Sequence, residues 1–215
     1  MTTIDGQNSR RGIYFWGTNA NAASLFLEGF TIQNGRQQGI SSSDDNKSFA
    51  FGGGMLVDRV PVTIKNIIFQ NNKAIGADNN FAHGGAAGGG GLAIRAVSNA
   101  VLEHITFIGN EARGGTGSER GGFAIGGGLY TYQSILLGDY LIFQSNKSLA
   151  GSSMGSGLSG GQRADAQGAG AAFQIGSFVN VNHLDVFDNQ AIGAMLPMVM
   201  QAVLLAGEFL LRYHH

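Results

Sequence analysis

The chain has no cysteine and only two prolines among its 215 residues. The absence of cysteine excludes disulfide bonds, thiolate metal sites and cysteine nucleophiles. With so little proline, the chain is neither collagen-like nor a proline-rich low-complexity segment. Hydrophobic residues make up 43% of it, which suffices for a core and argues against intrinsic disorder. Its stability must therefore come from packing and hydrogen bonds, without covalent cross-links.

Charge is also scarce and balanced, with 13 basic against 14 acidic residues. No run of lysine and arginine occurs in the sequence, so we expect no nucleic-acid partner, because neutralising phosphates requires clustered cations. The first residues, MTTIDG, have neither the basic nor the apolar segment of a secretory signal peptide. Because repeats start almost at once, we expect the chain to be a piece of a longer one or a reading frame that lacks its true start.

Glycine, by contrast, is abundant, with 36 residues against a usual share of roughly 7%. Many glycines open a repeated pattern of a glycine triplet, a short apolar strand, a second apolar stretch and an Asn. The segment from Arg11 to Gly35 is a first copy without the triplet, and we number the copies as repeats 1 to 5. Repeats 2 to 5 begin at Gly52, Gly89, Gly126 and Gly168. Repetition at this period predicts a stack of similar structural units.

Apolar and polar residues alternate within each repeat, which is the pattern of half-buried strands. A strand directly after the glycines supplies inward pairs such as Met55 and Val57. In the second apolar stretch, aligned inward positions form columns, one of which contains Ile32, Phe69, Phe107, Phe143 and Val186. A bend is expected within this stretch, at Gly29, Asn66, His104, Tyr140 and His183.

Three short strands separated by bends predict one triangular turn of a coil, and stacked turns place equivalent strands in parallel about 4.8 Å apart. The sequence therefore predicts an all-β fold, a right-handed parallel β-helix of about five three-strand coils with long Gly-rich loops. These loops fall between the Asn of one repeat and the glycines of the next. Since insertions on one face of a solenoid often form its binding face, we expect a ligand there.

One polar column recurs in repeats 2 to 5 and consists of Asn72, Asn110, Asn146 and Asn189. Asn tolerates left-handed backbone at turns, and amides in register stack into ladders. We therefore interpret this column as a structural turn column and not as a ligand site. Two glycosylation sequons begin at Asn46 and Asn146, and the second of them lies on this column.

The pattern of GGG followed by Leu or Met, an apolar stretch and F-x-x-N-x-A resembles the repeat of polymorphic outer-membrane proteins and related bacterial β-helix proteins of the pectate-lyase-like superfamily. The segments TTIDGQNSRRGIYFWG and LEGFTIQNG are similar to the first coils of those proteins, so the resemblance covers roughly residues 2–193. It implies the β-helix fold and an extracellular or outer-membrane, cell-surface location. Because this scaffold carries adhesins, passenger domains, lyases and hydrolases, the resemblance selects no single activity.

Catalysis on this scaffold needs clustered carboxylates, which hold calcium in lyases or flank the scissile bond in hydrolases. The acids of this chain are scattered along the sequence, so we assign no catalytic residue, no metal site and no cofactor. We assign ligand contact to two pairs of neighbours, namely Asp44 and Asp45 in a loop, and Asp58 and Arg59 after a strand.

The repeat pattern stops after Gly193, so we divide the chain into repeats over residues 1–193 and an apolar tail over residues 194–215. The tail is marginal for crossing a bilayer, which takes about 20 apolar residues, and it gives no strong membrane signal. Two interpretations stay open. The tail is either a short C-terminal helix that caps the open end of the stack, or a non-native end that replaces further repeats.

We interpret the chain as a non-enzymatic segment of a cell-surface or secreted β-helix protein that presents a loop-decorated face for adhesion or carbohydrate contact. A carbohydrate or a host or cell-surface ligand is then the expected partner, and the sequence leaves the oligomeric state open. The alternative is a fragment of a polysaccharide lyase or glycoside hydrolase. A third hypothesis, a flat binder of ice or mineral, is weaker because the outward column from Thr31 to Asp185 is irregular.

Overall fold

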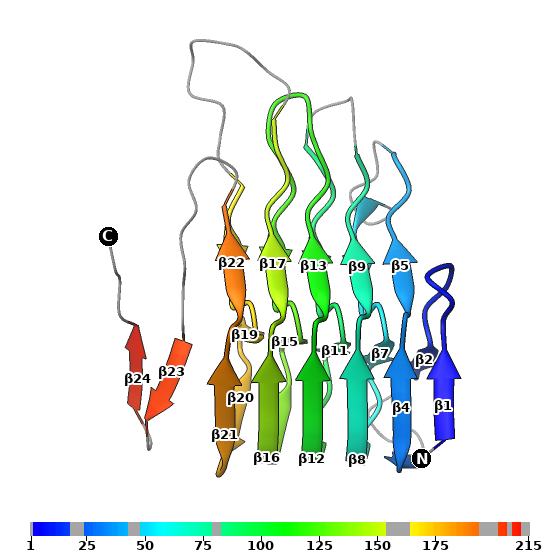
Figure 1. Ribbon diagram of the computed structural model, residues 1–215, viewed down its shortest axis with the longest axis vertical. Coiled ribbons are helices and arrows are strands. Elements are labelled where there is room, and N and C mark those ends of the chain that lie inside the picture. The colour runs from blue at the N-terminus through cyan, green and yellow to red at the C-terminus, as the bar shows by residue number, and fades with distance from the viewer. Residues whose placement is uncertain are drawn as a thin grey trace.

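The computed structural model describes residues 2–17, 24–42, 48–78, 83–153, 164–193, 202–205 and 208–211 (Figure 1). Almost all regular structure in these residues is β-strand, and every strand pair except the last is parallel. Equivalent strands of successive repeats lie side by side, so the chain enters the same sheets in the same order in each repeat. The predicted all-β class and the stacking of parallel strands are therefore confirmed.

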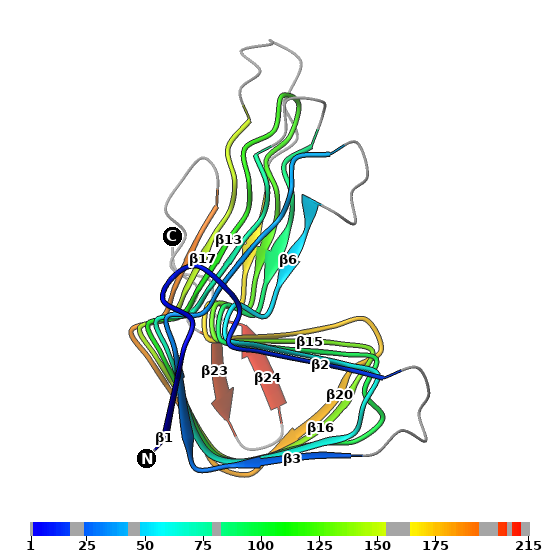
Figure 2. The same ribbon diagram turned by 90° about the vertical axis from the view of Figure 1, so that its right-hand side faces the viewer.

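Viewed along the stacking direction, the strands of two sheets enclose a triangle, which we call the prism (Figure 2). One sheet supplies two of its sides and contains β1 (Thr2–Asp5), β3 (Leu25–Glu28), β4 (Phe30–Gln33), β8 (Val62–Gln70), β12 (Ala100–Ile108), β16 (Ile135–Gln144), β20 (Phe178–Val181) and β21 (Leu184–Phe187). The third side contains β2 (Ile13–Trp16), β7 (Met55–Asp58), β11 (Leu92–Arg95), β15 (Leu129–Tyr132) and β19 (Ala171–Gln174).

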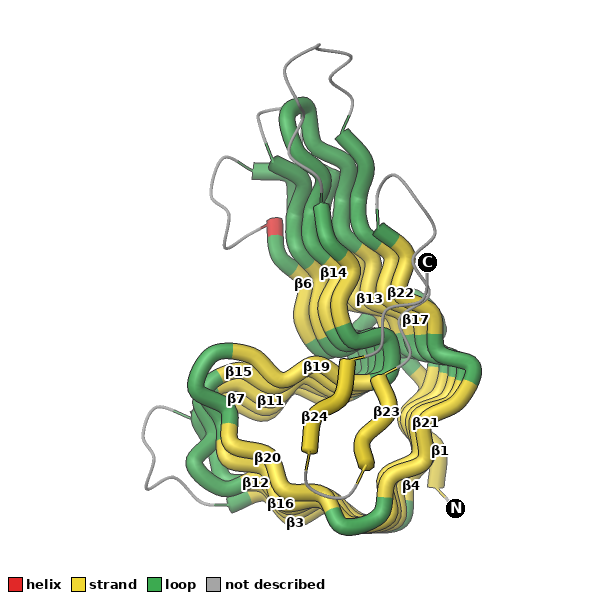
Figure 3. The backbone as a smooth tube through the Cα atoms, turned by 90° about the vertical axis from the view of Figure 1, so that its left-hand side faces the viewer, coloured by secondary structure: helices red, strands yellow, loops and turns green. Residues whose placement is uncertain are grey.

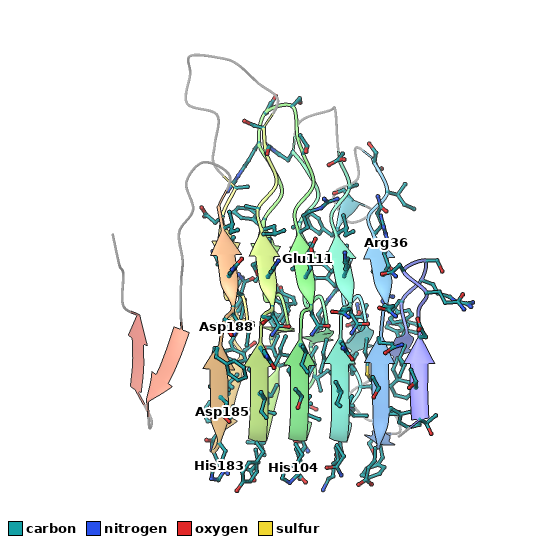
Figure 4. All side chains as sticks on the ribbon, in the orientation of Figure 1. Arg36, His104, Glu111, His183, Asp185 and Asp188 are labelled. Atoms are coloured by element: carbon teal, nitrogen blue, oxygen red, sulfur yellow. The ribbon has the colours of Figure 1, made fainter. Side chains whose placement is uncertain are left out.

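The three longest strands bend where the sequence predicts a bend. The backbone φ of Asn66, His104 and Tyr140 is 53°, 54° and 52°, in the left-handed region that interrupts a straight strand. Each strand thereby contributes its first half to one side of the prism and its second half to the next. On the outside of this corner the rings of His104, Tyr140 and His183 stack, with centroids 4.9 and 4.1 Å apart (Figure 4).

The interior of the prism is filled by the predicted inward columns. Phe69, Phe107 and Phe143 face one another across neighbouring strands and are almost completely buried. Their rings stack with centroids 5.1 and 4.7 Å apart and planes within 7° of parallel. Because the strands pair in register, each aromatic ring falls on the ring of the next repeat. A single repeat could not bury this surface alone.

The Gly-rich segments leave the prism at one corner and form a two-layered projection, which we call the arm (Figure 2). The segments keep long Gly-rich loops, as predicted, since described residues such as 76–78 and 114–116 belong to no strand, but short strands border these loops and pair with their equivalents in neighbouring repeats. The outgoing layer contains β5 (Arg36–Gln38), β9 (Lys73–Ile75), β13 (Glu111–Arg113), β17 (Lys147–Leu149) and β22 (Gln190–Ile192). The returning layer contains β6 (Ala50–Phe51), β10 (Ala87–Gly88), β14 (Ala124–Ile125) and β18 (Ala166–Gln167).

Small residues allow the two layers of the arm to touch. Near the prism, a cluster of buried alanines lies between the layers and consists of Ala50, Ala74, Ala87 and Ala112. Farther out, backbone hydrogen bonds alternate between the layers: Gly115 N donates to Gly85 O, Gly122 N to Gly115 O, and Gly151 N to Gly122 O, at 2.8–2.9 Å. Glycine is required for this approach, since a Cβ on Gly122 would collide with the carbonyl oxygen of Gly85.

We predict that Gly122→Ala lowers the free energy of unfolding by about 1–3 kcal/mol, the usual cost of overpacking. The added methyl group must displace the Gly85 backbone and break the alternating hydrogen bonds. Urea denaturation measures the loss, and hydrogen exchange should be faster at the amides of Gly115 and Gly151. Gly193→Ala is the matched control, because the nearest atom that the described residues bring to a Cβ there is the Ala164 carbonyl oxygen, at 3.9 Å. Equal stability of the two variants would contradict the close contact of the layers.

The described part of the tail is an antiparallel pair of strands, β23 (Ala202–Leu205) and β24 (Glu208–Leu211). The predicted C-terminal helix is therefore wrong for these residues. Short apolar runs such as AVLL and EFLL do not distinguish helix from strand by periodicity, and here they pair with each other. Figure 3 shows the pair beside the end of the prism that the last repeat forms. Residues 194–201 lie outside the described residues.

Candidate functional site

The outward side of β2, β7, β11 and β15 is rich in aromatic residues. The inward residues of these strands fill the core, so the alternate residues point outward and form two columns. The first column contains Tyr14, Leu56, Ala93 and Tyr130, and the second contains Trp16, Asp58, Arg95 and Tyr132. Aromatic side chains thus stand at both ends of this face, and Tyr14 and Trp16 are 56% and 51% exposed.

A groove of about 610 Å³ lies where this face meets the arm, in the angle between β15 and β6 in Figure 2. The prism contributes one wall and the returning layer of the arm contributes the other. Its described lining consists of Arg11, Tyr14, Phe49, Phe51, Leu56, Arg95, Tyr130 and Tyr132. We call it the aromatic groove. Five of these eight residues are aromatic and two are arginines, whereas none carries a carboxylate.

The floor of the aromatic groove depends on Gly88. The rings of Phe51 on β6 and Tyr130 on β15 stack with their centroids 5.4 Å apart and their planes 16° from parallel. They meet over β10, where Gly88 has no side chain. A Cβ at Gly88 would lie 3.0 Å from Phe51 Cδ1 and 3.2 Å from Tyr130 Cγ. A larger residue at this position would therefore push the two rings apart and fill the groove.

Arg95 brings a partly exposed positive charge to the groove. Its guanidinium lies 5.0 Å from the centroid of the Phe51 ring, within the range of a cation–π interaction. Arg95 Nη2 is 3.8 Å from Asp58 Oδ2, and Arg59 Nε is 3.4 Å from Asp58 Oδ1. Asp58 itself is only 6% exposed. Its carboxylate therefore offsets the positive charges of the two arginines and is not accessible to a ligand.

Arg11 lines the groove at its β2 end, beside Tyr14. Its Nε and Nη2 donate hydrogen bonds to the carbonyl oxygens of Gly52 and Phe51, at 2.9 and 2.8 Å. Because β6 is the edge strand of its sheet, these bonds satisfy acceptors that have no neighbouring strand. Burial lowers the pKa of Arg11 below its usual range, although a guanidinium stays charged at neutral pH. Its carbon Cζ lies 5.2 Å from the centroid of the Tyr14 ring.

Tyr130 supplies a neutral hydroxyl group at the other end. Burial raises the pKa of Tyr130 to about 12, with the nearby Arg95 charge acting in the opposite direction. At physiological pH the phenol therefore keeps its proton and can donate a hydrogen bond as well as accept one. The groove thus combines ring faces, arginine donors and a phenol, but its described lining holds no group suited to act as a general base.

The structure brings only part of the predicted ligand set to this site. Asp58 and Arg59 lie beside the groove and form ion contacts with their neighbours, whereas Asp44 and Asp45 lie outside the described residues. The sequence did not lead us to predict a role for the outward residues of this face, namely Tyr14, Trp16, Arg95, Tyr130 and Tyr132. The signal was present, because each of these residues follows an inward residue of the strand after the glycines and must point outward.

The four residues of the Asn column form a continuous ladder inside the molecule. Asn110 Oδ1 accepts hydrogen bonds from both Asn72 N and Asn72 Nδ2 at 3.0 Å, and Asn110 Nδ2 donates to Phe69 O at 2.9 Å. The same bonds recur from Asn110 to Asn146 and from Asn146 to Asn189. Every member is almost fully buried. Asn146 therefore cannot serve as a glycan acceptor in the folded chain, despite its sequon.

The described residues contain no group of three or more His, Asp or Glu side chains that could hold a metal ion. In the same part of the chain, no helix is long and apolar enough to cross a bilayer. Comparison with protein-family models, with curated proteins and with solved structures finds no match to this chain. The aromatic groove is therefore the candidate site on its geometry and chemistry alone.

Proposed function

We propose that this chain is a non-enzymatic segment of a bacterial cell-surface or secreted protein and that it binds carbohydrate in the aromatic groove. We further propose that the stacked sheets belong to a right-handed parallel β-helix of about five coils. The repeated order of the sheets and the in-register columns of Phe and Asn support this architecture. The groove lies at the base of the Gly-rich segments, next to the loop-decorated face on which the sequence predicts a ligand.

The observation that carries this proposal is the composition of the groove. Aromatic rings present flat apolar faces against which the C–H faces of sugar rings can pack, and the tyrosines add polar edges. Arg95 lies on β11, between the aromatic residues of β2 and β15, and its partly exposed guanidinium offers N–H donors to a ligand. Binding sites for small polar ligands commonly combine such an apolar lining with a few convergent polar groups.

A hydrolase or a lyase is the alternative, and the groove supports it less well. Hydrolysis of a glycosidic bond uses two carboxylates that flank it, and the described lining contains none. The nearest carboxylate, Asp58, is buried and engaged by Arg59 and Arg95. Binding without turnover is the function that these side chains support best.

The test is retention of the purified chain by a panel of neutral and acidic polysaccharides in affinity gel electrophoresis. We expect retention by at least one polysaccharide and a loss of about tenfold in affinity, or about 1.4 kcal/mol, for Gly88→Val, which fills the groove. Tyr132→Ala tests the exposed end of the groove without crowding its floor. Gly193→Val is the control, and thermal denaturation verifies that each variant is folded.

Two results would overturn the proposal. Retention that is equal for Gly88→Val, Tyr132→Ala and the unaltered chain would place any carbohydrate elsewhere. Formation of unsaturated or new reducing ends during incubation, lost in Asp58→Asn, would show an enzyme and contradict the non-enzymatic assignment. Absence of retention by the whole panel would count against carbohydrate as the ligand.

A further inference from the structure

A strip of positive charge crosses the outer face of the arm, on the opposite layer from the aromatic groove. Arg36 on β5, Lys73 on β9, Glu111 on β13 and Lys147 on β17 occupy equivalent positions of neighbouring strands. Arg113 stands two residues beyond Glu111 on the same strand. We call these five residues the basic strip. Figure 4 shows Arg36 and Glu111 on this outer face.

The alternation of these strands directs the basic strip away from the protein interior. The residues between its members, such as Ala74 and Ala112, face inward and form the alanine cluster of the arm. Side chains of the basic strip are exposed or half-buried. Parallel strands lie about 4.8 Å apart, so the charges of Arg36 and Lys73 are neighbours, and Lys73 and Lys147 lie about 10 Å apart on either side of Glu111.

The cations of the basic strip are not neutralised by the surrounding described residues. The ion pairs among these residues involve Arg59, Lys65, Arg95 and His183, and none includes a member of the strip. Arg36 donates a hydrogen bond to the neutral amide of Gln38. The basic strip contains four cations and one carboxylate, whereas the whole chain has a net charge of −1. The strip therefore has a local positive field that the net charge conceals.

We propose that the basic strip binds a linear sulfated or carboxylated polysaccharide that runs across β5, β9, β13 and β17. Cations occupy three of the four equivalent positions of this row, and Arg113 adds a fourth cation beside Glu111, so the row complements a chain that carries several anionic groups along its length. A glycan fits better than a nucleic acid, because the next outward row on the adjoining prism face contains Gln33, Gln70, Ile108 and Gln144 beside β5, β9, β13 and β17, and none of these four residues stacks on a base. An aromatic ring follows in this row only at Phe187, on the strand of the last repeat beyond Lys147. This site is separate from the aromatic groove and does not depend on it.

Heparin is the probe, and binding is measured by calorimetry at low and at physiological ionic strength. We expect weaker binding at the higher salt concentration, because exposed charges are screened. The double variant Lys73→Gln/Lys147→Gln should lose about tenfold in affinity, since each exposed ion contact contributes up to about 1 kcal/mol. Glu111→Gln should bind a few-fold more tightly, which loss of folding cannot imitate. Lys65→Gln is the control, because Lys65 lies on another face and pairs with Glu103 at 2.7 Å.

Several outcomes would overturn this proposal. Unchanged affinity of the Lys73→Gln/Lys147→Gln variant or of Glu111→Gln would remove the basic strip from the binding surface. Tighter binding of single-stranded DNA than of heparin would reassign the partner to nucleic acid. Loss of heparin binding in Gly88→Val would move the ligand to the aromatic groove, whereas retention there supports two independent sites. Equal binding of heparin whose sulfate groups have been removed and whose carboxyl groups have been reduced would show that neither anionic group is recognised.

Discussion

Replacing Asn110 by alanine is expected to lower the free energy of unfolding by at least about 1–3 kcal/mol, because it leaves a buried backbone N–H without its acceptor and removes a second hydrogen bond to a buried carbonyl oxygen. These groups are Asn72 N, which donates to Asn110 Oδ1, and Phe69 O, which accepts from Asn110 Nδ2. Chemical denaturation followed by circular dichroism measures the difference.

Asn180→Ala provides the control for this prediction. Asn180 lies on β20 and is exposed, so its replacement should change the stability by less than about 0.5 kcal/mol. Asn110→Asp keeps the shape of the side chain but removes its two donated hydrogen bonds and buries a carboxylate. We therefore expect it to destabilise the fold as well, most strongly at neutral pH where the acid is ionised. An Asn110→Ala variant as stable as Asn180→Ala would contradict the buried ladder.

Replacing Phe107 by alanine is expected to cost about 3–5 kcal/mol, the range for removing a large aromatic residue from a core. Phe107 is the middle ring of the stack and contacts Phe69 on one side and Phe143 on the other. Its loss leaves a cavity between two rings whose strands are held in register by the sheet, so the neighbours cannot collapse into the space. Urea denaturation measures the loss of stability.

Phe178→Ala removes the same side chain from the surface and serves as the matched control. Phe178 is 63% exposed, so the variant should lose less than about 1 kcal/mol. Phe107→Leu should retain most of the stability that Phe107→Ala loses, because it fills more of the cavity. If Phe107→Ala and Phe178→Ala were equally stable, the predicted inward column would not be the core of the folded chain.

The parts of the fold that the sequence predicts are those that repeat. Period-two alternation identifies the inward residues, and the spacing of Phe69, Phe107 and Phe143 then places them on adjacent strands in register. The structure has these pairings and the bends at Asn66, His104 and Tyr140. Such predictions succeed because a shift of one residue in the pairing of two strands would turn the buried side chains toward solvent, so the register is strongly specified.

The close contact between the two layers of the arm was not predictable from the same reasoning. The segments of the arm are dominated by glycine, and a glycine-rich segment shows no alternation of polar and apolar residues. The close contact of its layers depends on the absence of side chains at Gly85, Gly115 and Gly122. In the sequence, glycines at these positions indicate a loop and give no sign that two layers touch there. The basic strip, in contrast, could have been found, because Lys73, Glu111 and Lys147 directly follow the predicted Asn column in the sequence.

The aromatic groove could have been found in part. The strand after the glycines has outward residues as well as inward ones, and the aromatic character of Tyr14, Trp16, Tyr130 and Tyr132 is visible in the sequence. What the sequence lacks is the second wall, since Phe49 and Phe51 reach the groove only because the arm folds back beside the prism. The site therefore depends on a tertiary arrangement that local patterns do not encode.

Trp16 allows the most direct test of the aromatic groove as a carbohydrate site, because it is the single tryptophan of the chain and stands half-exposed at one end of this face. Its fluorescence is followed while soluble oligosaccharides of the polysaccharide that the chain retains are added. We predict a saturable shift of the emission to shorter wavelength, with the same dissociation constant as calorimetry gives, and a loss of both signals in Gly88→Val. Trp16 stands on the same face but outside the lining of the groove, so the deciding result is the effect of Gly88→Val. Calorimetric binding of equal affinity by Gly88→Val and the unaltered chain would contradict the assignment of carbohydrate binding to this groove.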